Sequence, residues 1–89
     1  MRLQELLDEY IKNTEAVLAE IEIIQSAGID NKKVNSVIET AKSYLKDAKY
    51  YRNRKRFKTG LASIAYSEGL LDALKLLEVA EFSWPKKKQ

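Results

Sequence analysis

The sequence contains no cysteine and no histidine, and these two absences exclude much of the chemistry found in small proteins. Without cysteine there is no disulfide framework, no thiolate zinc site and no thiol nucleophile. Without histidine there is no imidazole acid or base and no histidine-ligated metal. Carboxylates, lysines and tyrosines remain. We therefore predict no catalytic residue, no cofactor, no metal site and no enzymatic activity.

Helix breakers and long apolar runs are also scarce. The 89 residues include one proline and three glycines, which leaves long stretches free to form helix. No stretch of eighteen apolar residues exists, so we expect no membrane-spanning segment. Acidic residues interrupt the first ten positions, where a secretory signal needs an apolar run. These features together favour a cytoplasmic protein without a membrane partner.

Apolar residues recur every three or four positions in three stretches, which is the spacing of amphipathic helices. We expect helices from Arg2 to Ala27, from Lys32 to Arg52, and from Arg56 or Phe57 to Glu78. Short links between helices force neighbours to run antiparallel. The prediction is an all-α fold, an up-down-up antiparallel three-helix bundle.

The links and the C-terminal segment support the same division of the chain. Gly28 suits the left-handed position after a helix, and Asp30 or Asn31 can cap the next one. We assign residues 1–80 to a single domain and residues 81–89 to a tail. In this tail Phe82 and Trp84 are expected to pack back onto the bundle, whereas the lysines at 86–88 are expected to stay mobile.

The third predicted helix is apolar around most of its circumference. Its sequence from residue 62 to 77, ASIAYSEGLLDALKLL, has a charged strip made only by Glu68, Asp72 and Lys75. Such a helix is usually covered on more than one side, and two partly apolar neighbours cannot cover it completely. Gly60 and Gly69 suggest places where another backbone comes close. We therefore expect a closed homodimer in contact through this helix.

Charge is distributed unevenly along the chain. Residues 1–27 carry a net charge of −4, residues 28–58 carry +7, and residues 59–89 are balanced. The basic residues that matter are Lys42, Lys46, Lys49, Arg52, Arg54, Lys55, Arg56 and Lys58. With Tyr50 nearby, one interpretation is binding to RNA or DNA through phosphate contacts and base stacking. The interpretation we favour is a charged face that meets the acidic first helix of the same or another protomer.

Two further sets of polar residues allow a structural and a chemical interpretation. Glu68 and Asp72 stand one helical turn apart, so they share a face and could hold a divalent cation or act as an acid–base pair. We favour a solvated strip, or ion pairs with Lys75 and the second helix. Tyrosines and an aspartate form the other set, for which we favour a structural network between the second and third helices. Its members are Tyr44, Asp47, Tyr51 and Tyr66.

Part of the chain resembles a known family. Tyr44, Asp47 and Tyr51, followed by IAYSEGLLDAL from Ile64 to Leu74, are similar to the archaeal uncharacterised family called domain of unknown function 357, over about residues 35–78. The basic turn at 54–56 and the Trp-Pro-Lys tail depart from its pattern. The resemblance implies a small archaeal three-helix bundle, sometimes appended to nucleotidyltransferase-like domains, which makes such a protein a candidate partner. It implies no activity.

These observations favour a helical interaction or assembly module without catalytic activity. The alternative is an accessory RNA- or DNA-binding domain that uses the basic turn between the second and third helices.

Overall fold

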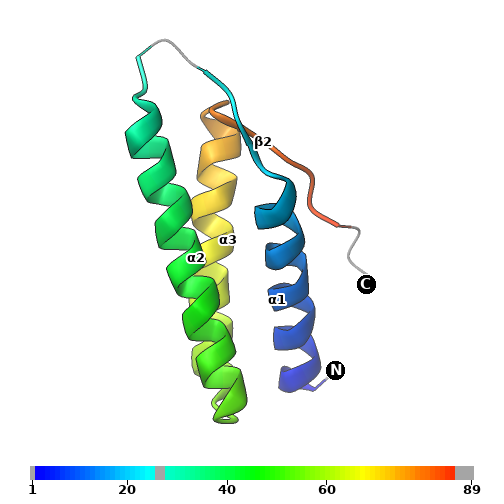
Figure 1. Ribbon diagram of the computed structural model, residues 1–89. Helices are drawn as coiled ribbons and strands as arrows, with labels where there is room; N and C mark the ends of the chain where they lie inside the picture. Colours follow the sequence, from blue (N-terminus) through cyan, green and yellow to red (C-terminus); the bar gives the residue numbers. More distant parts are fainter. Residues whose placement is uncertain (1, 26–27, 86–89) are drawn as a thin grey trace.

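Three α-helices make up most of the computed structural model, which describes residues 2–25 and 28–85. They are α1 (Leu3–Glu20), α2 (Asn31–Asn53) and α3 (Phe57–Leu76), and they lie side by side in Figure 1. Two short strands, β1 (Glu22–Ile23) and β2 (Ala80–Glu81), form an antiparallel pair. The protein is therefore all-α, as predicted.

Contacts between distant residues identify what lies at each end of the molecule. At one end, an ion pair joins Asp8 of α1 to Arg52, close to the turn between α2 and α3. At the other end, Glu22 pairs with Glu81 and Ile23 with Ala80. The C-terminal ends of α1 and α3 therefore share the end where the strands lie (Figure 1).

The first helix is shorter than its sequence pattern suggested. The prediction extended it to Ala27, which lies outside the described residues, but α1 ends at Glu20 and Ile21 is already extended, with ψ 132°. The residues after Glu20 include Ile21, Ile23 and Ile24. Isoleucine is β-branched, and β-branched residues favour extended backbone when a partner strand is available. As a result Ile23 is half-buried near Val79 and Ala80.

The other helix boundaries agree closely with the prediction. Before α2, Gly28 has φ 96°, and the Asp30 side chain accepts a hydrogen bond of 2.9 Å from the Lys32 backbone N–H. After α3, Glu78 takes a left-handed conformation with φ 59°. The next backbone N–H, from Val79, then donates to the Leu74 carbonyl at 3.1 Å, which closes the helix end.

The core runs the whole length of the molecule between the three helices. Near the α2–α3 turn it contains Leu7, Ile11, Leu45, Ala48 and Ile64. In the middle Val17, Ala41 and Leu71 meet Phe82, and near the strands the core contains Val34, Ile38, Leu74, Val79 and Ala80. Phe82 is only 7% exposed, so the segment after β2 completes the core rather than hanging free. The lysines at 86–88 lie outside the described residues.

None of the helices in the described ranges has both the length and the apolar character required to cross a membrane.

Candidate functional site

The inward side of α3 is fixed by close contacts with the other two helices. Ile64, Leu71 and Leu74 are buried against them. The Ser67 hydroxyl is also buried and donates a hydrogen bond of 2.7 Å to the Ala41 carbonyl of α2. At Gly60 a Cβ would lie 2.7 Å from the Leu7 side chain of α1 and 3.4 Å from the Ala48 carbonyl oxygen of α2, so the α2 backbone comes close here, as the sequence suggested.

The segment after β2 covers another side of α3. The Trp84 indole Nε1 donates a hydrogen bond of 2.6 Å to Asp72, and the Lys75 amine lies 5.1 Å from the centre of the Phe82 ring. Phe82 and Trp84 meet edge to face. Asp72 is thus neither simply solvated nor paired with Lys75, which were the outcomes favoured from sequence.

The remaining side of α3 is apolar and faces outward. At 100° per residue it occupies an arc of about 140°, and from end to end it is about 22 Å long. We call it the outer face of α3, and it consists of Ala62, Ala65, Tyr66, Gly69, Leu70, Ala73 and Leu76, together with Leu77, the C-cap residue of the helix.

Most of this outer face is exposed, although Leu70 is half-buried against the core. Leu76 is 83% exposed, Tyr66 64% and Leu77 58%. The stretch between Ala62 and Leu70 lines a shallow apolar groove. A Cβ at Gly69 would meet nothing within 4 Å among the described residues, in contrast to Gly60. Beyond its own helix, no described residue therefore lies close to where a side chain at position 69 would begin.

The tyrosines near this face do not form one network. Tyr66 stacks on Tyr44 of α2, with ring centres 5.2 Å apart, at one border of the outer face. Tyr51 instead meets Tyr50 edge to face, further toward the α2–α3 turn. Asp47 is exposed on α2. The four residues that we grouped from sequence are therefore divided between separate places.

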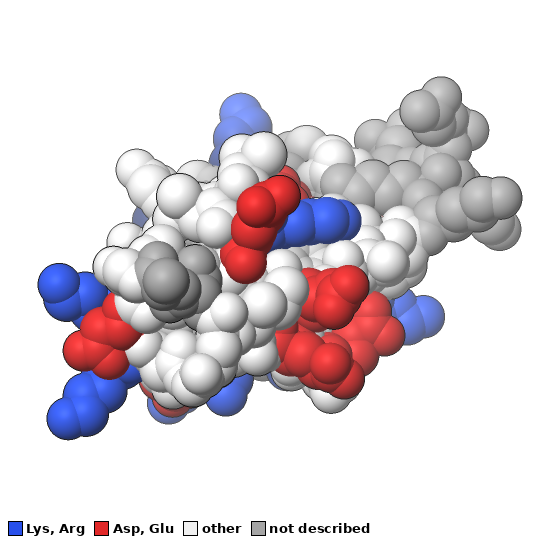
Figure 2. All heavy atoms as spheres, turned by 90° about the horizontal axis from the view of Figure 1, so that it is seen from above, with Lys and Arg blue, Asp and Glu red and all other residues white. Residues whose placement is uncertain are grey.

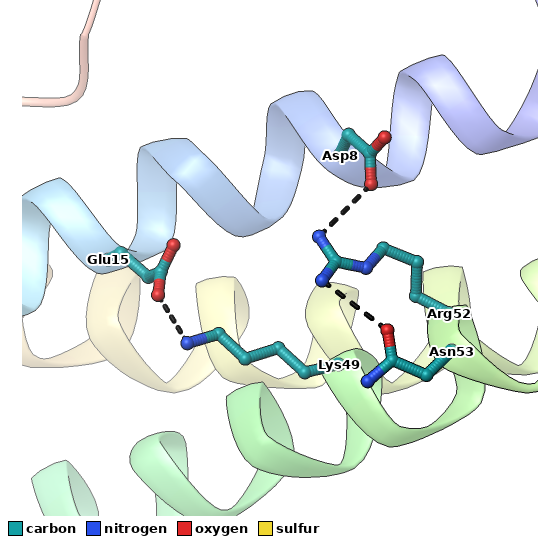
Figure 3. A network of polar contacts seen from close by, with 5 residues as sticks. All are labelled: Asp8, Glu15, Lys49, Arg52 and Asn53. Carbon is teal, nitrogen blue, oxygen red and sulfur yellow. Dashed lines mark hydrogen bonds and ion pairs between the residues drawn. The ribbon is translucent and has the colours of Figure 1, made fainter.

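Several basic residues of α2 pair with acidic residues. Lys49 pairs with Glu15 of α1, and Arg52 pairs with Asp8 of α1 at 3.3 Å (Figure 3). Lys42 pairs with Glu39 of its own helix at 3.0 Å, while Lys46 is exposed. For Lys49 and Arg52 the structure thus agrees with the interpretation we favoured, a basic face that meets the acidic first helix of the same chain.

The cations at the α2–α3 turn have a different environment. Arg54 lies over the Tyr50 ring at 4.7 Å, and Arg56 lies over the Tyr51 ring at 5.4 Å. Lys55 has φ 60°, and Lys58 is exposed in the first turn of α3. We call Arg54, Lys55, Arg56 and Lys58 the basic turn. No ion pair joins any of them to a carboxylate within the described residues.

The opposite end of the molecule is acidic. Glu20, Glu22 and Glu81 line a shallow hollow there with Lys75, and exposed Glu78 follows α3 at the same end. Figure 2 looks down on this end and shows acidic side chains gathered together. We call Glu20, Glu22, Glu78 and Glu81 the acidic end. Sequence reasoning missed it because its members come from two segments almost sixty positions apart, which the β1–β2 pair brings together.

The acidic side chains of the described residues are not clustered as a metal site requires. Across the part of the chain that the structure describes, no three of them come together in a way that could hold a metal ion. Glu68 is half-buried and Asp72 bonds to Trp84, so these two residues do not stand as a pair open to solvent.

The comparisons with known proteins identify a family but no function. The chain belongs to the family described as protein of unknown function (DUF357), whose model matches residues 9–80. This match includes all of α2 and α3 and most of α1, and is wider than the 35–78 segment that carried the resemblance. No curated protein and no solved structure matches the chain.

Proposed function

We propose that this protein is a non-enzymatic interaction module of the cytoplasm, an up-down-up three-helix bundle that forms a homodimer through the outer face of α3. The observation that carries the proposal is the exposure of this face, where Leu76, Tyr66 and Leu77 are all more than half exposed. Monomeric proteins rarely expose a contiguous apolar patch larger than a few hundred Å². The face is therefore better explained as a contact surface than as free surface.

The energy available at such a contact is considerable. Burial of one exposed leucine or aromatic side chain contributes about 1.5–3 kcal/mol. Two copies would each contribute Tyr66, Leu76 and Leu77, and their small neighbours allow the helices to approach closely. A second copy is the natural occupant because an identical face can cover it in a closed two-fold dimer, the commonest oligomer.

Light scattering coupled to size-exclusion chromatography tests the proposal. We expect about twice the 10.2 kDa chain mass at high micromolar concentration. Leu76→Glu combined with Gly69→Glu should give a folded monomer, because two carboxylates would enter the apolar contact. Asn35→Glu, at an exposed position of α2, is the matched control and should leave the dimer intact. A wild-type chain that stays monomeric would overturn the homodimer and direct the search to a nucleotidyltransferase-like partner.

A second candidate function is binding of RNA or DNA by the basic turn. The specific observation is that its four cations lack carboxylate partners within the described residues, whereas Lys49 and Arg52 are paired. Cations without a carboxylate partner can release counterions from a phosphate backbone, and exposed Tyr50 can stack on a base.

Fluorescence anisotropy with a mixed-sequence single-stranded RNA tests this second candidate. Binding should weaken steeply with salt, and changing Arg54, Lys55 and Arg56 together to serine should remove it. Changing Lys32 and Lys33 to serine, at exposed positions at the start of α2, controls for loss of net charge elsewhere. Equal affinity of the basic-turn variant and the wild type would exclude the turn as the site.

A further inference from the structure

We infer that the two copies pair with their α3 helices antiparallel and crossing at Gly69, so that the basic turn of each copy lies beside the acidic end of the other. This inference rests on the proposed homodimer and specifies its geometry. Three independent observations support it: the side-chain sizes on the outer face, the open backbone at Gly69, and the charges at the two ends of α3.

Side-chain size changes along the outer face. Ala62 and Ala65 lie in the N-terminal half of α3, and the strongly exposed Leu76 and Leu77 lie at its C-terminal end. A two-fold axis through Gly69 that crosses an antiparallel pair places residue 69+n of one copy opposite residue 69−n of the other. Leu76 then packs over the partner's Ala62, large against small. A parallel pair would set leucine against leucine at one end and alanine against alanine at the other, which splays the helices or leaves a void.

The missing side chain of Gly69 leaves its backbone open to a partner helix, which explains why the two helices cross at this position. This glycine is seven residues from both Ala62 and Leu76, at the centre of the face. Glycine costs about 1 kcal/mol relative to alanine within a helix, and no neighbour in the described chain requires it here. At Gly60 the other glycine of α3 accommodates Leu7 of α1. A partner helix at Gly69 would use the missing side chain in the same way.

The opposite charges of the basic turn and the acidic end favour the antiparallel direction of pairing. Helix α3 begins at the basic turn and leads to the acidic end, so an antiparallel pair brings Lys58 of one copy toward Glu78 of the other. A parallel pair would gather two basic turns at one end and two acidic ends at the other, with unfavourable Coulomb energy at both. The helix dipoles also oppose each other favourably in the antiparallel pair. Complementary charge of this kind fixes orientation more than it adds affinity.

Cysteine cross-linking tests the arrangement, since the natural sequence has no cysteine to interfere. With a rise of 1.5 Å per residue, the two copies of residue 62 would lie about 21 Å apart in the antiparallel pair. A disulfide requires Cα atoms about 4.4–6.8 Å apart. We therefore expect Ala62→Cys and Leu76→Cys chains to form a mixed disulfide when combined, and neither chain to cross-link alone at position 62 or 76. Intact mass spectrometry distinguishes mixed from symmetric products.

Gly69→Cys separates failure of the arrangement from failure of the dimer. Residue 69 lies on the two-fold axis, so its cysteine should cross-link in either direction of pairing. Cross-linking at 69 with symmetric disulfides at 62 and at 76 would show a parallel pair and overturn the inference alone. A 20 kDa particle by light scattering without the mixed 62–76 product would also overturn it. A monomer with no cross-link at any position would overturn the proposed function itself.

Discussion

Individual residues in this small protein hold backbone conformations that their side chains do not favour. Lys55 and Glu78 both have positive φ, at 60° and 59°, in the left-handed region where glycine is the usual residue. Each follows the C-cap residue of a helix, where the left-handed conformation lets the last helix carbonyls accept hydrogen bonds from the next backbone N–H groups. The folded state therefore has unfavourable backbone strain at these two positions, and a glycine there would relieve it.

Glu78→Gly should stabilise the fold. An L-residue in the left-handed conformation costs about 1 kcal/mol, so we expect the free energy of unfolding to rise by about that amount. Urea denaturation at low micromolar protein concentration measures the change. Glu78→Ala is the control, because it removes the charge but keeps the Cβ and so should give no comparable gain. Equal stabilisation by alanine and glycine would assign the effect to charge and contradict the backbone argument.

The two glycines of α3 should respond oppositely to alanine. Gly60→Ala brings a methyl group to 2.7 Å from Leu7 Cδ2, inside a fully packed site, and the clash should exceed the gain in helix propensity. Gly69→Ala adds a methyl group in open space, so the monomer should gain up to about 1 kcal/mol. Circular dichroism melting at low micromolar concentration compares the two variants. Destabilisation of the monomer by Gly69→Ala would mean that this position is not open.

At the scale of the secondary-structure elements, the sequence predicted helices well where periodicity was long and uninterrupted. The apolar rhythm and the cap at Asp30 placed α2 and α3 within about two residues of their observed ends. The end of α1 was predicted too late, because helical spacing continues through Ile21 and Ile24 while tertiary contact with β2 makes the chain extended. A two-residue strand depends on a partner almost sixty positions away, which local pattern does not reveal.

The candidate site was predictable to a similar degree and for similar reasons. The excess of apolar surface on α3 follows from its sequence alone, since helical geometry fixes which residues share a face. The ion pairs of Lys49 and Arg52 with α1 agree with the alternation of acidic and basic segments. The Trp84–Asp72 hydrogen bond did not follow, because it depends on how the segment after β2 folds back over α3.

The β1–β2 pair provides a test of the acidic end. Glu22 lies directly opposite Glu81, and like charges in that position destabilise a strand pair by about 0.2–1 kcal/mol. Glu81→Lys should therefore stabilise the monomer, and Glu81→Gln should do so by a smaller amount. Thermal melts at low and at 1 M salt measure both variants, and the differences should shrink as salt screens the charges. Salt-independent effects would show that repulsion between these glutamates is not the cause.

At the scale of the whole molecule, α3 has the basic turn at its start and the acidic end at its finish. In the proposed antiparallel dimer, this distribution of charge predicts which variants associate with each other. We consider a variant whose basic turn carries Lys55→Glu, Arg56→Glu and Lys58→Glu. A second variant carries Glu22→Lys, Glu78→Lys and Glu81→Lys at the acidic end. In an antiparallel dimer each variant alone brings like charges together. Exposed ion pairs contribute about 0.2–1 kcal/mol each, so the loss of several should weaken each homodimer about tenfold or more at low salt.

Mixing the two variants should restore association. At one side of the mixed dimer, the glutamates in the turn of the first variant meet the lysines at the end of the second. At the other side, the unaltered acidic end of the first variant meets the unaltered basic turn of the second. Sedimentation equilibrium with one variant fluorescently labelled measures the dissociation constants of the mixed and the like pairs. The preference for the mixed pair should be strong at 50 mM salt and nearly lost at 1 M, where the screening length is about 3 Å. In a parallel dimer the mixed pair would also be favoured, but there the wild-type homodimer would tighten with added salt instead of weakening. A wild-type affinity that rises with salt, or no preference for the mixed pair at 50 mM, would contradict the arrangement in which each basic turn faces the partner's acidic end.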